Sequence, residues 1–219
     1  MAYRFHPIIV LVLLLARPLA ADDTQFELEG DKKTDVTDGE FVTAAKGKMG
    51  VRAVRLSTCR VSDAAFEQLA RWSELYGVYL RDPAATGTGF KLLKDLPKLE
   101  QVDLFGPNVT DAGAEAVSKS VGVTHFQTGS GLRSNGKPYQ SRLTDKSLNA
   151  IATMPALQFL TIDNADITDE GLKALAGSKK LEWVLFLRCP SVTPKGIAAL
   201  KRVRPGCDVR CPFEPKNDR

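Results

Sequence analysis

Histidine is scarce in this chain of 219 residues, and long apolar runs are missing. Only two histidines occur, His6 near the N-terminus and His125, which excludes multi-histidine metal sites and leaves few histidine-dependent mechanisms. No stretch approaches the roughly 20 apolar residues that a membrane-spanning helix needs. The charges nearly balance, with 30 Lys and Arg against 26 Asp and Glu, so nothing favours nucleic-acid binding. With 43% hydrophobic residues, the composition is that of an ordered globular protein.

The N-terminal segment 1–21 has the pattern of a signal peptide. Arg4 supplies a positive start, residues 8–15 are an unbroken apolar run, and small residues at 20–21 precede two aspartates. This arrangement predicts cleavage near Ala20 or Ala21 and export to the periplasm or the cell exterior. A buried N-terminal strand or an uncleaved anchor is the alternative interpretation.

A regular internal repeat dominates the rest of the chain. Apolar residues recur at positions 1, 4 and 6 of units that start at residues 51, 75, 99, 123, 157 and 181. The one longer gap, from 123 to 157, indicates an insertion of ten residues, which we place within 129–142. The other units repeat every 24 positions. A self-similar period of this length is the signature of a solenoid, in which stacked units share one core.

Each unit is predicted to hold a short strand followed by a helix. The apolar positions alternate as in a strand with one buried face. Downstream, a hydroxyl residue that can cap a helix precedes a phrase such as Asp169-Glu170-Gly171-Leu172. An aspartate follows the cap in most units, where it suits the helix dipole, and Pro194 takes that slot in the last unit. The predicted N-cap residues are Ser62, Thr86, Thr110, Thr144, Thr168 and Thr193.

The LxxLxL strand followed by (I/V)TDxGLxxL, best seen in Leu157–Leu200, resembles leucine-rich repeats of the cysteine-containing, ribonuclease-inhibitor-like class. It is most similar to secreted bacterial leucine-rich repeat proteins such as those of planctomycetes. The resemblance covers about residues 51–211 and implies an α/β fold: a right-handed solenoid with a parallel sheet on its concave face and helices on its convex face. It also implies a non-enzymatic binding module that needs no cofactor. Cys59 and Cys189 occupy the slot where this class bonds the backbone of the turn.

These patterns together predict four segments. After the signal peptide, residues 22–50 are polar and expected to be mostly irregular, forming an N-terminal cap with a degenerate repeat. Residues 51–206 form six leucine-rich repeats, and residues 207–219 form a closing strand and a tail.

The concave face supplies the candidate binding residues, because side chains at positions 3, 5 and 7 must point away from the core. Aromatic anchors and polar discriminators there point to an unidentified protein partner. The alternative is that the insertion or the tail covers Phe159 and Trp183 within the chain. The candidates are Tyr79, Arg81, Asp103, Phe105, His125, Phe159 and Trp183.

A second hypothesis is a structural envelope component that binds a polyanion or carbohydrate through its basic C-terminal helices. Residues 173–210 hold nine basic side chains and two acidic ones, although a solvated helix face is the default interpretation. The oligomeric state is left open.

Four further motifs have ordinary explanations. Residues 131–137 match the spacing of a phosphate-binding loop, but Pro138 follows where Ser or Thr is required. His125 with Ser130 or Ser134 lacks a third orienting group for catalysis. Asn108 begins a glycosylation sequon that matters only in a eukaryote. Strand spacing excludes a Cys59–Cys189 disulfide, whereas pairing among Cys189, Cys207 and Cys211 is left open.

Overall fold

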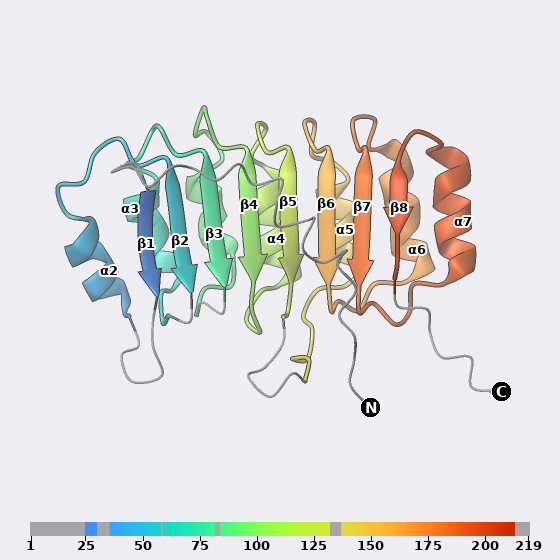
Figure 1. Cartoon of the computed structure of the whole chain (residues 1–219), viewed down its shortest axis with the longest axis horizontal. Helices are drawn as coiled ribbons and strands as arrows, with labels where there is room; N and C mark the ends of the chain where they lie inside the picture. Colours follow the sequence, from blue (N-terminus) through green and yellow to red (C-terminus); the bar gives the residue numbers. More distant parts are fainter. Residues whose placement is uncertain (1–24, 30–35, 58, 82–83, 132–136, 213–219) are drawn as a thin grey trace.

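The computed structural model describes residues 25–29, 36–57, 59–81, 84–131 and 137–212. The predicted signal peptide lies outside these residues. The described chain forms one sheet of eight parallel strands, which lie side by side in their sequence order (Figure 1). The strands are β1 (Gln25–Glu29), β2 (Ala53–Ser57), β3 (Gly77–Arg81), β4 (Gln101–Phe105), β5 (His125–Gly129), β6 (Phe159–Asp163), β7 (Trp183–Leu187) and β8 (Asp208–Arg210).

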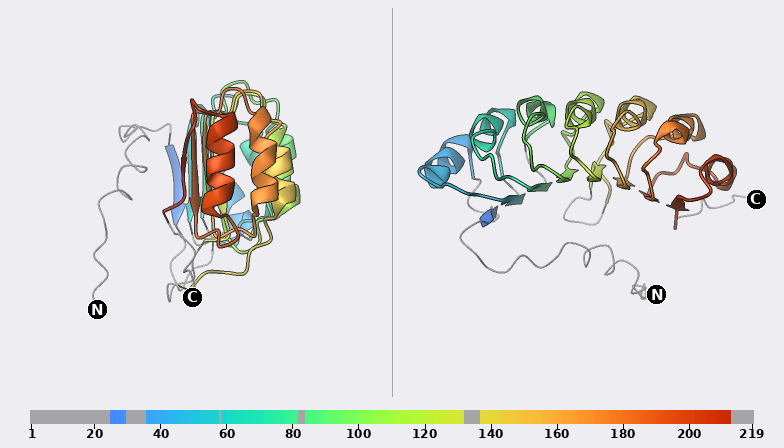
Figure 2. Two further views of the ribbon diagram at one scale, coloured as in Figure 1. Left: turned by 90° about the vertical axis from the view of Figure 1, so that its right-hand side faces the viewer. Right: turned by 90° about the horizontal axis from the view of Figure 1, so that it is seen from above.

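Helical segments connect successive strands and form a second layer. Seen from above, the layers curve together, with the strands inside and the helices outside (Figure 2). The predicted α/β leucine-rich-repeat solenoid, with its sheet on the concave face, is confirmed. The α-helices are α2 (Asp38–Ala45), α3 (Phe66–Leu69), α4 (Asp111–Ser118), α5 (Asp145–Ile151), α6 (Asp169–Leu172) and α7 (Pro194–Val203), and the 3-10 segments are η1 (Asp63–Ala65), η2 (Thr88–Leu92) and η3 (Lys173–Gly177).

The core lies between the layers and is built from the apolar positions of the repeats. Each strand is paired in register, so that Val54, Val78 and Val102 form one row, and all three are fully buried. Thr128 is the exception, a polar residue at position 6 with no exposed surface. Its hydroxyl donates to the carbonyl of Leu104 at 3.0 Å, which satisfies the buried group.

In the described residues before Gly50, 25–29 and 36–49, the chain is more regular than its sequence indicates, since it forms β1 and α2. β1 pairs in parallel with β2, with Phe26 opposite Val54, whereas Val54 in turn lies opposite Val78. The first of these offsets is longer than the repeat, which hides β1 from a search at the regular period. The Phe26 ring packs against Phe41 and Trp72, each with its centroid at 5.6 Å.

The six predicted cap residues each accept a backbone N–H of the helical turn that follows. Five of them, Ser62, Thr110, Thr144, Thr168 and Thr193, directly precede that turn. The hydroxyl of Thr86 accepts the N–H of Thr88 at 3.4 Å, but Gly87, with φ of 93°, lies between Thr86 and η2. Short 3-10 turns also replace much of the helix expected in three units.

The aspartates after the caps connect neighbouring repeats. Asp145 accepts both the backbone N–H of Thr168, at 2.8 Å, and its hydroxyl, at 2.6 Å. Asp169 binds Thr193 of the last repeat in the same way. Each Thr-Asp pair therefore caps its own helix and anchors the helix of the next repeat. Pro194 ends the series, since it offers no carboxylate.

All four cysteines lie in the described residues, where none of them forms a disulfide. Burial raises the pKa of Cys189 to about 12, and its Sγ lies 3.3 Å from the carbonyl oxygen of Leu187.

Candidate functional site

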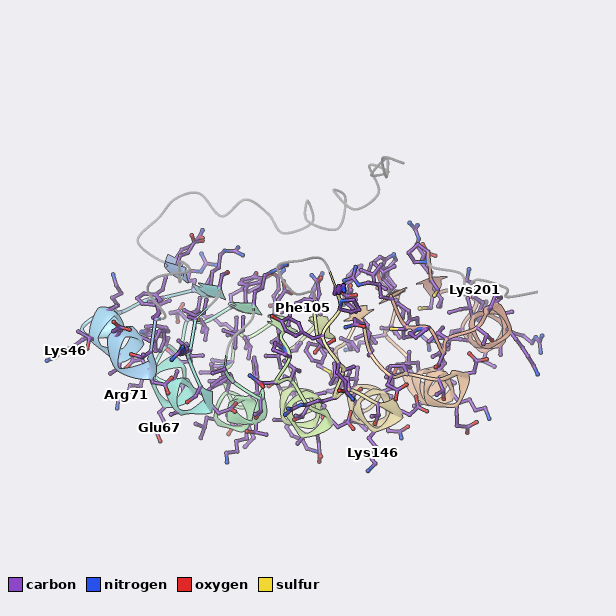
Figure 3. The ribbon with its side chains drawn as sticks, turned by 90° about the horizontal axis from the view of Figure 1, so that it is seen from below. Lys46, Glu67, Arg71, Phe105, Lys146 and Lys201 are labelled. Carbon is purple, nitrogen blue, oxygen red and sulfur yellow. The ribbon has the colours of Figure 1, made fainter. Side chains whose placement is uncertain are left out.

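The concave face is organised into rows that run across the strands. Gln101, His125, Phe159 and Trp183 are register partners in successive strands. The second row holds Tyr79, Asp103, Gln127, Thr161 and Leu185, and the third holds Arg81, Phe105, Gly129, Asp163 and Leu187. All seven candidate residues thus lie on one face, the strand side on which Figure 3 labels Phe105.

Phe159 and Trp183 lie side by side on this face. Both are half-buried, and neither belongs to the cluster of core residues between sheet and helices. His125 stacks on the Phe159 ring, with centroids 4.4 Å apart and planes 16° apart. Thr124 places its Oγ1 2.8 Å from the His125 Nδ1. The Phe159 ring therefore packs against His125, whose own ring is hydrogen-bonded to Thr124.

Leucines extend this aromatic pair into an apolar patch. Leu185 lies between the rows of Trp183 and Leu187 on β7 and is 8% exposed, outside the core cluster. Leu187 is half-buried. We call Phe159, Trp183, Leu185 and Leu187 the apolar patch. Whether residues 132–136 or 213–219 cover it lies outside the described residues.

Tyr79 offers less free surface than its sequence position indicates. A Cβ placed on Gly77 would come within 2.7 Å of the Tyr79 ring, so the ring lies flat over that glycine. The Arg55 guanidinium covers the ring at 4.1 Å from its centroid. The Tyr79 hydroxyl donates to Gln101, and burial raises the Tyr79 pKa to about 12. Tyr79 thus mainly makes contacts within the protein and leaves little of its ring for a partner.

Asp103 and Arg81 lie together at the middle of the face. The Arg81 Nη2 is 3.9 Å from the Asp103 Oδ2, too far for a hydrogen bond. The Arg81 guanidinium lies 5.5 Å from the centroid of the Phe105 ring. Burial raises the Asp103 pKa to about 6, against the opposing effects of Arg81 and Arg55.

Two arginines of this face, Arg55 and Arg188, were not singled out from the sequence. Arg55 pairs with Glu27 at 3.1 Å, and Arg188 pairs with Asp163 at the end of the apolar patch. Burial raises the Asp163 pKa, and Arg188 opposes that change. Arg55 could have been found from its place in the second row, but no sequence signal shows that Arg188 reaches back to the preceding strand.

The insertion is anchored at its base by β6. Asn164 donates from Nδ2 to the carbonyl of Tyr139 at 2.7 Å, and Ser130 donates to the carbonyl of Asn164 at 2.8 Å. Asn164 has a φ of 50°, a conformation that asparagine tolerates. Residues 132–136 of the sequence resembling a phosphate-binding loop lie outside the described residues.

The described residues contain no group of three or more His, Cys, Asp and Glu side chains placed to hold a metal ion. None of the helices in these same segments is both long and apolar enough to cross a bilayer.

One comparison with known proteins agrees with the repeat pattern. A family model described as Leucine Rich repeat matches residues 155–176. Among solved structures, a chain of "Crystal structure of TLR13-ssRNA13 complex" is similar, with 11% identity and a TM-score of 0.27 over 85% of this chain and 35% of that chain. This chain thus spans about a third of that chain's length, and the likeness carries no argument about ligands. The curated proteins give no match.

The sheet topology, the strand register and the matching repeat agree with one another. The chain folds as a leucine-rich-repeat solenoid, and such repeats are generally protein-interaction modules.

Proposed function

We propose that this protein is a non-enzymatic binding module that captures another protein on its concave sheet face. The proposal includes export, which depends on the leader pattern of residues 1–21 alone. The observation that carries the binding proposal is the apolar patch, whose two aromatic rings are adjacent, half-exposed and outside the core. Exposed apolar patches that contain aromatic rings are typical of contact sites.

The decisive variant is the double substitution Phe159→Ala and Trp183→Ala. Because both rings lie outside the core, we expect the variant to fold, with unfolding free energy lowered by about 1–2 kcal/mol from lost stacking and surface contacts. Capture of the partner should fall at least about tenfold, as for interface hot spots. Circular dichroism checks folding. Capture is measured by placing a photo-crosslinking residue at Leu187 and identifying adducts formed in the native extract.

A matched control removes apolar side chains of the helix side. Leu92 and Val121 are 43% and 68% exposed there, and their double alanine variant should leave the adducts unchanged. If the concave variant unfolds, its rings are structural and the proposal fails. It fails equally if the concave variant folds and still gives the same adducts.

A further inference from the structure

The concave face has two parts. In one part the polar side chains already bind one another, and in the other some of them have no hydrogen-bond partner among the described residues. Near β2 and the middle of β3, polar side chains are already paired: Arg55 binds Glu27, Tyr79 donates to Gln101, and Gln101 donates to the Tyr76 hydroxyl at 3.0 Å. A partner would gain little there, because each new contact would replace an existing one. Arg81, at the end of β3, has no such close contact.

The second part begins at β4 with Asp103. Its side chain is only 13% exposed, yet within the segments that the structure describes it accepts no hydrogen bond. Gln127, its register partner on β5, likewise has no hydrogen-bond partner among those residues. Phe105 lies two residues further along β4, on the same face of the strand as Asp103.

Folding does not require a carboxylate at this position. The same row carries Thr161 and Leu185 in later repeats, so a neutral side chain fits the backbone equally well. A buried carboxylate without hydrogen-bond donors opposes folding. Groups that oppose stability yet lie on an open face are candidates for a binding role.

We propose that the partner delivers a lysine or arginine side chain to Asp103 and an aromatic or aliphatic side chain to the apolar patch. This inference rests on the proposed function and specifies its partner. A cation is the strongest complement of a desolvated carboxylate, because charge-assisted hydrogen bonds are about twice as strong as neutral ones. The partially exposed Arg81, which comes no closer to the carboxylate than 3.9 Å, can move aside over Phe105.

The strand spacing sets the distance between the two contacts. Asp103 on β4 lies two strands from Phe159 on β6 and three from Trp183 on β7. With about 4.8 Å per strand and about 6.6 Å for the two-residue offset along the strands, these separations are roughly 12 and 16 Å. An extended segment advances about 3.3 Å per residue, so the basic and apolar residues of the partner should lie about three to five positions apart.

The charge of the face argues against a polyanionic ligand. Three of its arginines form close ion pairs, Arg55 with Glu27, Arg188 with Asp163 and Arg210 with Asp208, whereas Arg81 lies 3.9 Å from Asp103. Balanced pairs leave no field that would attract a polymer of one sign.

The test is a selection from a phage library of random peptides on the immobilised full protein. Enriched peptides should contain Lys or Arg about three to five positions from an aromatic or aliphatic residue. One such peptide is then synthesised with its basic residue intact or replaced by norleucine. Both peptides are titrated against the wild type, Asp103→Asn, the Phe159→Ala/Trp183→Ala variant and the control Asp95→Asn, whose carboxylate is exposed on the connection between η2 and β4.

On the wild type and on Asp95→Asn, replacing the basic residue should weaken binding at least about tenfold, as expected when a close charge pair is truncated. On Asp103→Asn that replacement should have little effect. Enriched peptides without a basic residue, or equal effects on both aspartate variants, overturn the inference. In that case the proposed function still holds if the enriched peptides bind the Phe159→Ala/Trp183→Ala variant more weakly than the wild type. If no enriched peptide loses affinity on the Phe159→Ala/Trp183→Ala variant, the result contradicts both the proposed function and the inference about Asp103.

Discussion

Asp103 lies at the middle of the concave face, where burial opposes its ionised form more strongly than Arg81 and Arg55 favour it. A pKa raised to about 6 from an ordinary 3.8 means that the folded protein holds this proton more tightly than the unfolded chain. The contribution of Asp103 to stability is therefore complete below about pH 4 and is lost as the pH rises through 6.

Asp103→Asn removes this pH-dependent loss. We expect the variant to exceed the wild type in unfolding free energy by about 2–3 kcal/mol at pH 7.5 and by nearly nothing at pH 4. Urea denaturation at a series of pH values measures the difference. Asp95→Asn, whose parent side chain is 83% exposed, serves as the control for removing one carboxylate. An Asp103→Asn variant that is less stable at pH 7.5 would show that Arg81 and Arg55 hold the carboxylate in place.

At the scale of the element, the motif Thr-Asp-x-Gly makes contacts between repeats as well as within one helix. The Asp145 carboxylate, fixed by its two hydrogen bonds to Thr168, occupies the space where a Cβ on Gly171 would stand. That Cβ would lie 2.2 Å from the Asp145 Oδ1. Gly196 has the same relation to Asp169, at 2.0 Å. Glycine is thus required because the preceding repeat fills the place of its side chain.

Gly171→Ala should therefore destabilise the protein, although alanine is the better helix former. Displacing the carboxylate loses charge-assisted hydrogen bonds of about 1.5–3 kcal/mol, against a propensity gain of about 1 kcal/mol. We expect a net loss of about 1–2 kcal/mol in thermal or urea unfolding.

Gly177→Ala is the matched control, since nothing lies within 4 Å of its added Cβ. It should be neutral or slightly stabilising. Adding Asp145→Ala to Gly171→Ala should cost less than the sum of the single variants, because the clash disappears with the carboxylate. Additive losses would mean that the two residues do not compete for the same space.

The elements themselves were largely readable from the sequence, and the exceptions have physical reasons. Alternation and period placed β2 to β7, because positions 4 and 6 of these repeats face one shared core. β1 was not predicted because its offset from β2 exceeds the repeat period. It packs through the rings of Phe26, Phe41 and Trp72. After Thr86 the expected helix is the 3-10 segment η2, preceded by Gly87 in the left-handed region, although the Thr86 hydroxyl still accepts the N–H of Thr88.

The candidate site was predictable as a set of positions but not as a set of contacts. The register alone puts Phe159 beside Trp183, since strand alternation fixes which side chains share a face. The register does not show that Arg55 covers the Tyr79 ring or that Gln101 accepts a hydrogen bond from the Tyr79 hydroxyl. Nor does it show that the Asp103 carboxylate is buried without a hydrogen-bond donor among the described residues. Those facts depend on rotamers and on burial by neighbouring strands, which a repeat pattern does not encode.

At the scale of the whole molecule, the distribution of charge separates the proposed function from the polyanion alternative. The C-terminal repeat carries exposed cations on α7 and the loop before β7, among them Lys179, Lys180 and Lys201, the last labelled in Figure 3. Basic residues in the last turn of a helix suit its dipole, and Arg204 donates to the carbonyls of Lys179 and Leu181. Helix termination and packing thus explain much of this charge.

We therefore expect only weak attachment to a polyanion. On a heparin column the full protein should elute at or below an ionic strength of about 0.15 M, because a few exposed cations are largely screened there. Replacing Lys179, Lys180 and Lys201 with glutamate should change that elution by no more than replacing Lys46, Lys91 and Lys146 does. Retention well above about 0.15 M that only the C-terminal replacements abolish would favour the polyanion alternative. Such a result would leave the apolar patch without a role in that attachment, because apolar contacts do not weaken with salt.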